Sequence, residues 1–292
     1  MGESKDCRKS RPSAFQRAAR RIKRNLVHRF CTLPSAPRIL AFVVGCQRSG
    51  TTMLMECFQK DLRAKCFGEN SAFTNHPGKS DDSHRLKSFD DIERILGRER
   101  ARLIVTKPLV DSQNTVALLD RFPASRAVWM FRHYKDVVNS YIVKWGDDMP
   151  KKNLRVLVSG DRPDHWMSEN AADGTRAVAR SHFSEEVPPQ DSAALFWYVR
   201  NMLFLDLGLH EDARVLPCDY DDLVSAPESA MRGMYGHLGV EYPGGHVIDH
   251  IHARSVRRGK DVEISAPIEQ LCVDLLARLA ALRPETAPCE ST

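Results

Sequence analysis

Short apolar runs alternate with amphipathic segments along most of the chain. The apolar runs predict β-strands at 39–44, 102–106, 127–131 and 214–217. Apolar residues spaced three or four apart predict helices at 52–60, 115–121, 135–145, 192–207, 227–238 and 267–282. Short buried strands that alternate with helices are typical of a parallel sheet whose two faces are both covered. The pattern therefore predicts an α/β fold with a parallel central sheet flanked by helices.

Residues 146–190 lack a clear hydrophobic period. They carry many Gly, Pro, Asp and Asn residues, and a stretch of this length is long for a passive loop. We therefore expect a lid, or an insertion that faces a substrate.

The N-terminal segment differs from the rest of the chain in its charge. Residues 1–38 hold eleven Lys and Arg residues against two acidic ones, whereas the remaining residues hold 32 basic and 36 acidic side chains. Between residues 13 and 30, apolar side chains fall on one face of a predicted helix and basic side chains fill most of the rest. Because prolines follow at positions 34 and 37, we predict a basic amphipathic arm at 1–37 and one domain at 38–292.

Three interpretations of this arm remain open. A basic amphipathic helix at 13–30 is suited to an anionic membrane surface. An Arg-rich, acid-poor segment also fits a transit peptide. A helix whose basic side chains are only solvated needs no partner. We expect no nucleic-acid partner.

The overall composition excludes several classes of protein. The chain has 292 residues, of which 42% are hydrophobic and 28% charged, and these ordinary values rule out a disordered, collagen-like or polytopic membrane chain. None of its eight cysteines forms a Cys-x-x-Cys pair or a zinc-finger spacing. We therefore expect reduced thiols, no metal site and a cytoplasmic location, with membrane association through the arm as the open alternative.

The candidate chemistry begins directly after the first predicted strand. The turn there reads Gly45-Cys-Gln-Arg48-Ser49-Gly50-Thr51-Thr52. Such a turn aims backbone N–H groups at an anion, and the N-terminus of the next helix adds positive potential. Its two glycines have the spacing of a nucleotide-binding P-loop, but Thr51 stands where that loop has a phosphate-binding Lys. The turn therefore predicts an anion site that differs from a standard ATP site.

This turn resembles the 5′-phosphosulfate loop of the P-loop sulfotransferase family, in the form that carries Arg. Arg132 at the end of a predicted strand and Ser140 eight residues later resemble the 3′-phosphate motif of that family, and Arg offers a planar fork to a phosphate. Tyr220 lies in a segment that resembles the family's Tyr-Glu-Asp-Leu segment, and a basic loop near residue 255 resembles its C-terminal cofactor loop. The resemblance implies that the donor is bound by Arg48, Ser49, Gly50, Thr51, Thr52, Arg132, Ser140, Tyr220, Ser255, Arg258 and Lys260.

The resemblance also implies a set of catalytic residues. Glu69 follows Arg48 by 21 residues, where the protein-tyrosine and carbohydrate branches of the family carry a Glu base that takes the proton of the acceptor hydroxyl. Lys107 resembles the Lys that stabilises the bridging oxygen, and Arg48 would stabilise charge on the sulfuryl group. His133 is the rival base. The structural alternatives are a Glu69 without a catalytic role and a Lys107 that only pairs with Asp111.

The resemblance covers roughly residues 38–283 and implies a single α/β domain related to nucleotide kinases. It implies transfer of a sulfuryl group, without a metal, from 3′-phosphoadenosine 5′-phosphosulfate (PAPS) to a hydroxyl or amine. Glu69 favours a carbohydrate, lipid-linked or peptide acceptor over a small phenol. Two alternatives stay open. One is an ATP-dependent kinase of a small molecule, which the presence of Thr51 in place of the P-loop Lys disfavours. The other is a non-catalytic, membrane-docked sulfotransferase-like binding protein.

Overall fold

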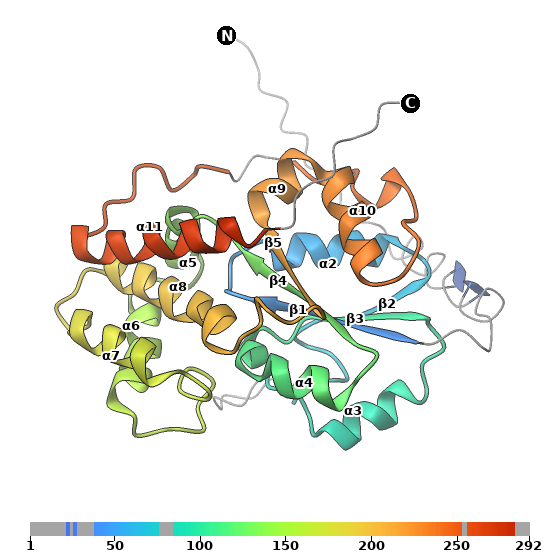
Figure 1. The fold of residues 1–292 in the computed structure, drawn as a ribbon, viewed down its shortest axis with the longest axis horizontal. Helices are drawn as coiled ribbons and strands as arrows, with labels where there is room; N and C mark the ends of the chain where they lie inside the picture. The colour runs from blue at the N-terminus through green and yellow to red at the C-terminus, as the bar shows by residue number, and fades with distance from the viewer. Residues whose placement is uncertain (1–21, 24–25, 28–37, 76–83, 253–255, 284–292) are drawn as a thin grey trace, which may run out of the picture.

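The central sheet has five strands, and every neighbouring pair is parallel. The computed structural model describes residues 22–23, 26–27, 38–75, 84–252 and 256–283. Within them the strand order is β2-β3-β1-β4-β5 (Figure 1). The strands are β1 (Ile39–Gly45), β2 (Ala64–Phe67), β3 (Leu103–Thr106), β4 (Arg126–Phe131) and β5 (Val215–Asp219). The predicted α/β fold with a parallel sheet is confirmed.

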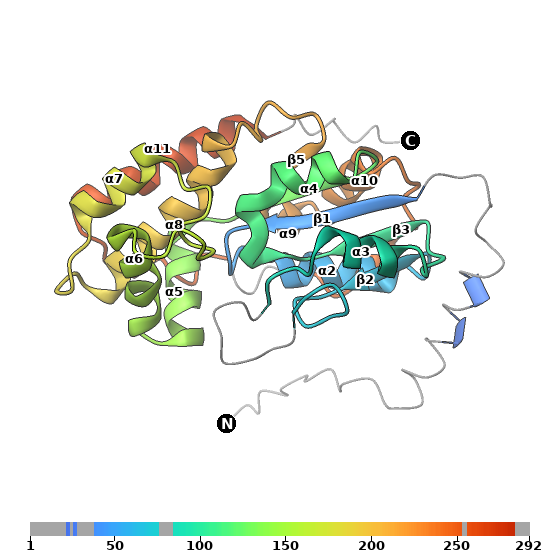
Figure 2. The ribbon, with the colours of Figure 1, turned by 90° about the horizontal axis from the view of Figure 1, so that it is seen from below.

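Helices cover both faces of this sheet. They are α2 (Thr51–Lys60), α3 (Phe89–Leu96), η1 (Leu109–Asn114), α4 (Thr115–Arg121), α5 (Tyr134–Trp145), α6 (Asp148–Ser159), α7 (Asp173–His182), α8 (Pro189–Asp206), α9 (Tyr220–Ser225), α10 (Pro227–His237), η2 (Gly245–Val247) and α11 (Ala266–Ala281). Helices α2, α9 and α10 lie on one face, and α3 and α4 lie on the other (Figures 1 and 2). Helices α5, α6, α7, α8 and α11 form a group beside the sheet.

The sequence of β1 explains why both faces are buried. Phe42 and Val44 belong to the core under α4 and α8, whereas Ala41 and Val43 belong to the core under α2 and α10. All four side chains are almost completely buried. Because successive side chains of a strand point to opposite faces, a run of apolar residues is what a central strand requires. The polar residues that follow the strands are thereby left at the carboxyl edge of the sheet.

The segment 146–190 has regular structure that its sequence pattern did not indicate. It contains α6 and α7, which pack against each other and against α8. Leu154 and Leu157 on α6 and Ala179 on α7 are completely buried. The apolar face of each helix is narrow, and this is why the sequence pattern did not show its period. The segment is thus part of the helical group beside the sheet.

Most of the N-terminal arm lies outside the described residues. Residues 22–23 and 26–27 are helical, and Ile22 and Leu26 are exposed. The division into an arm at 1–37 and a domain at 38–292 stays a prediction. Among the residues that the structure describes, no helix has both the length and the apolar character to cross a membrane.

Candidate active site

The turn after β1 is built around two glycines that no other residue can replace without rearrangement. Gly45 has a φ of 121° and Gly50 a φ of 85°, a region that favours glycine. A Cβ on Gly45 would lie 2.2 Å from the carbonyl oxygen of Met130, and a Cβ on Gly50 would lie 2.2 Å from Cδ2 of Tyr220. The turn is therefore pressed against β4 on one side and against Tyr220 on the other.

Helix α2 begins at Thr51, directly after this turn. Gly50 caps it in the left-handed conformation without a side-chain cap, and its first turn contains no acidic residue. The first N–H groups of a helix have no partner within the helix and carry partial positive charge. Ser112 on η1 binds both the N–H and the carbonyl of Gly45, at 3.1 and 3.2 Å, which holds the turn in place.

Strands β2 and β3 bring Glu69 and Lys107 together. The strands pair with Phe67 opposite Thr106, so that the residues following them share one edge of the sheet. The Lys107 Nζ lies 3.6 Å from the Glu69 Oε1 and donates a hydrogen bond of 3.1 Å to the Thr52 Oγ1. The Lys107 side chain is 10% exposed and that of Glu69 is 38% exposed. A buried cation thus lies between the helix N-terminus and a carboxylate that is open to solvent.

Strands β4 and β5 place Arg132 and Tyr220 in the same way. Phe131 and Asp219 pair at the ends of these strands. The residue that follows each strand, Arg132 or Tyr220, is a predicted site residue. The Arg132 guanidinium lies 4.3 Å from the centroid of the Tyr220 ring and donates a 2.9 Å hydrogen bond to the Asp136 Oδ2. Both Arg132 and Asp136 are buried.

Arg48 connects the turn to α5. Its backbone has a φ of 69°, and its side chain lines the cavity. The Arg48 Nε donates a 2.9 Å hydrogen bond to the Ser140 Oγ, and the guanidinium lies 5.5 Å from the ring centroid of Trp145. Burial lowers the pKa of Arg48 and the charge of Arg132 lowers it further, whereas Glu69 acts in the opposite direction. Three charged site residues therefore influence one another.

These side chains line one cavity of about 540 Å³. Ten of the residues predicted from the sequence line it, and they are Arg48, Gly50, Thr51, Thr52, Glu69, Lys107, Arg132, Ser140, Tyr220 and Arg258. The lining contains five basic side chains against two acidic ones. None of the lining residues comes from 146–190, and the expectation that this segment is a lid or faces a substrate stays a prediction.

Two predicted site residues, Ser49 and Lys260, stand outside the cavity lining, and a third lies outside the described residues. Ser49 is completely buried within the turn. Lys260 is exposed and stands outside the cavity lining. Ser255 lies outside the described residues. The lining thus includes residues of the turn and Arg258 but neither Ser49 nor Lys260, and donor binding by each of these residues stays a prediction.

The rival base, His133, has a structural task. Its Nδ1 accepts a 3.3 Å hydrogen bond from the N–H of Lys135 at the start of α5. Its ring stacks on Tyr134 with centroids 4.6 Å apart, and burial lowers its pKa. His133 is absent from the cavity lining. Of the two candidate bases, the structure therefore places Glu69 alone in the cavity lining.

Sequence reasoning missed several residues of this site. Asp136 holds Arg132, and Ser112 holds Gly45. Asp136 follows Arg132 by only four residues, and an acidic residue so near a predicted site arginine was the available signal. Other residues that were missed line the cavity, namely Gln47, Met53, Leu109, Asn139, Val143, Lys144 and Trp145.

Comparisons with known proteins give a limited result. No family model matches the sequence, and no curated protein matches it. The solved structures that are similar to the chain include the sulfotransferase domain from the Synechococcus PCC 7002 olefin synthase, with 16% identity, a TM-score of 0.47, and coverage of 84% of this chain and 95% of that one. A sulfotransferase from Alicyclobacillus acidocaldarius has 17% identity, a TM-score of 0.46, and coverage of 85% and 96%. A sulfotransferase domain from the curacin biosynthetic pathway has 16% identity, a TM-score of 0.47, and coverage of 85% and 99%.

Proposed function

We propose that this protein is a sulfotransferase that transfers the sulfuryl group of PAPS to a hydroxyl of a carbohydrate, lipid-linked or peptide acceptor, with an amine as the other possible recipient. One observation carries the proposal. Six separate segments of the chain meet in one cavity, and each contributes a residue that the resemblance had assigned to this chemistry. Those residues include Arg48, Glu69, Lys107, Arg132 and Arg258.

The residues present suit PAPS as a ligand. PAPS carries anionic groups on both its 5′ and 3′ positions and an adenine base on the 1′ carbon of its ribose. The cavity has a volume of about 540 Å³, within the range of small-molecule sites. Lys107, Arg48 and the N-terminus of α2 would hold the 5′-phosphosulfate. Arg132 and Arg258, with Ser140, would hold the 3′-phosphate.

The turn favours this donor over ATP. A P-loop that binds nucleoside triphosphates uses a Lys at the position of Thr51 to contact the β- and γ-phosphates. Here the cations come instead from Arg48 within the turn and from Lys107, which directly follows the neighbouring strand β3. A kinase is therefore the less favoured function. Metal-independent transfer stays a prediction.

The catalytic roles follow from charge and position. Bound PAPS supplies an activated sulfuryl group. Lys107 is held beside the start of α2 by its hydrogen bond to Thr52, so that its charge would stabilise negative charge developing on the transferred group and on the departing phosphate. Glu69 is 38% exposed, so its carboxylate is accessible to an acceptor from solvent. It would accept the hydroxyl proton there.

Transfer of label from ³⁵S-labelled PAPS tests this proposal. Acceptors of three classes are used: a carbohydrate, a glycolipid and a peptide, and release of sulfate into water is measured alongside. We expect label in one acceptor class. A protein that binds 3′-phosphoadenosine 5′-phosphate (PAP) but neither labels an acceptor nor releases sulfate would be a non-catalytic binding protein, which contradicts the proposal.

A further inference from the structure

Asp136 is a buried carboxylate that joins two distant parts of the cavity wall. It lies in the first turn of α5, and its side chain is 3% exposed. Its Oδ2 accepts hydrogen bonds of 2.9 Å from the Arg132 Nη2 and from the backbone N–H of Arg257. Its Oδ1 accepts a 2.8 Å hydrogen bond from the N–H of Gly259. One side chain therefore holds both Arg132, at the end of β4, and the loop at residues 257–259.

The loop fits this carboxylate closely. Arg257 has a φ of 59°, a backbone conformation that costs free energy for a residue other than glycine. A Cβ on Gly259 would lie 2.1 Å from the carbonyl oxygen of Lys135. The two N–H groups bound by Asp136 flank Arg258, which lines the cavity. The position of the Arg258 backbone is thus set by Asp136.

We propose that Asp136 is a positioning residue that sets the selectivity of the site for a 3′-phosphate. It acts through Arg132 on one side and through residues 257–259 on the other, so that two arginine side chains converge on one phosphate. This inference rests on the proposed function, because it assumes that the donor carries a 3′-phosphate. Asp136 itself is an acid and is not expected to contact that phosphate.

The substitution Asp136→Asn separates this role from simple packing. A carboxylate offers acceptors on both oxygens, and Asp136 uses both for N–H donors. An amide has nearly the same size but accepts on one oxygen only. Whichever way it turns, its NH₂ group faces at least one backbone N–H, and the loop must move or lose a hydrogen bond.

A second buried aspartate provides a matched control. Asp191 lies in the first turn of α8, is 4% exposed, and its Oδ1 accepts a 2.8 Å hydrogen bond from the N–H of Ser265. It therefore also holds a segment from the C-terminal part of the chain, and it is absent from the cavity lining. An amide oxygen can still accept the hydrogen bond from Ser265, so Asp191→Asn should leave selectivity for the 3′-phosphate unchanged.

The second test variant is Gly259→Ala. Its added Cβ would push the loop away from Lys135 while the charge of Asp136 stays intact. If position rather than charge matters, Gly259→Ala reproduces the effect of Asp136→Asn. This variant also keeps the inference testable if Asp136→Asn fails to fold.

The measurement is the ratio of two dissociation constants on the full-length protein. PAP and adenosine 5′-phosphate, which differ in the 3′-phosphate alone, are titrated by calorimetry into the wild type and the three variants. We expect the preference for PAP to fall roughly tenfold or more in Asp136→Asn and in Gly259→Ala, and to be unchanged in Asp191→Asn, because one lost charge-assisted contact changes affinity by about this factor.

Three other results would count against the inference or its premise. If both affinities fall equally in Asp136→Asn, the residue is structural only and the inference is wrong. If the preference of both test variants equals that of the wild type, the inference is also wrong. If the wild type has no preference for PAP, the proposed function fails, and this outcome is recognised before any variant is made.

Discussion

Replacing Glu69 by Gln should stop catalysis while leaving the fold and the donor site in place. Glu69 lies 3.6 Å from the Lys107 Nζ, a distance at which two unit charges attract by about 1 kcal/mol in water. Because the Glu69 side chain is 38% exposed, screening by solvent is strong, and such pairs contribute at most about 1 kcal/mol to stability. We therefore expect the Tm to fall by no more than about 4 °C.

The effect on turnover should be far larger. The amide keeps the size of the carboxylate but does not accept the hydroxyl proton, and loss of a general base lowers rates by about 10²- to 10⁴-fold. Affinity for PAP should stay the same or rise slightly, because a negative charge leaves a cavity that binds an anion. Lys107 keeps its hydrogen bond to Thr52, so its position is preserved.

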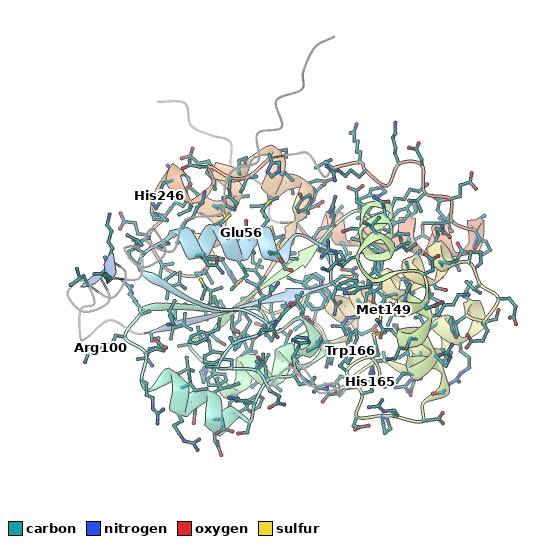
Figure 3. All side chains as sticks on the ribbon, turned by 180° about the vertical axis from the view of Figure 1, so that it is seen from behind. Glu56, Arg100, Met149, His165, Trp166 and His246 are labelled. Carbon is teal, nitrogen blue, oxygen red and sulfur yellow. The ribbon has the colours of Figure 1, made fainter. Side chains whose placement is uncertain are left out.

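Turnover, the dissociation constant of PAP and the Tm are measured on one preparation. Glu56→Gln is the control. Glu56 lies on α2 (Figure 3), its Oε2 is also 3.6 Å from a partner, the His250 Nε2, and it is absent from the cavity lining. Near-normal turnover of Glu69→Gln would refute its role as base. A large loss of PAP affinity with little change in turnover would make Glu69 a structural partner of Lys107.

Three further predictions concern other parts of the molecule. Arg132→Ala should weaken PAP binding by about 1.5–3 kcal/mol, the range for a hydrogen bond to a charged group, with a smaller effect on turnover at saturating donor, and an unchanged calorimetric affinity would contradict the assignment. Deletion of residues 1–35 should preserve activity on a dissolved acceptor and reduce binding to anionic liposomes at low salt, whereas equal retention of both proteins would argue against a membrane role. Burial raises the pKa of Asp219 to about 6, so its ionisation destabilises the fold as the pH rises from about 4 to 6. The stability of Asp219→Asn relative to the wild type should therefore improve between pH 4.5 and 7.5, by no more than about 3 kcal/mol, and denaturant titrations that give the same difference at both pH values would contradict this.

Local sequence patterns were sufficient to predict most of the sheet and the turn after β1. Four of the five strands were predicted because each is a short apolar run, as a strand buried on both faces requires. β2 was missed because Lys65 interrupts its apolar residues. Helix α3 was missed as well, although Ser88 caps it by accepting a hydrogen bond from the N–H of Asp91, a signal that the sequence contains.

Contacts between segments were harder to predict. The pairing of Glu69 with Lys107 depends on the register of β2 against β3, and the strand β2 was not foreseen. The role of Asp136 depends on a loop about 120 residues later in the sequence. Only tertiary packing brings this loop next to Asp136. The resemblance to a family supplied the roles of Arg132 and Arg258, whereas hydrophobic periodicity carries no such information.

The central claim is that the cavity binds a nucleotide with a 3′-phosphate rather than a nucleoside triphosphate. The most direct test is a calorimetric comparison of PAP with ATP in the presence of Mg²⁺, on the full-length protein at one ionic strength. With Arg48, Lys107 and Arg132 among the cations of the site and Thr51 in place of the P-loop Lys, we predict that PAP binds at least tenfold more tightly. Equal or tighter binding of ATP would contradict the claim and favour a kinase.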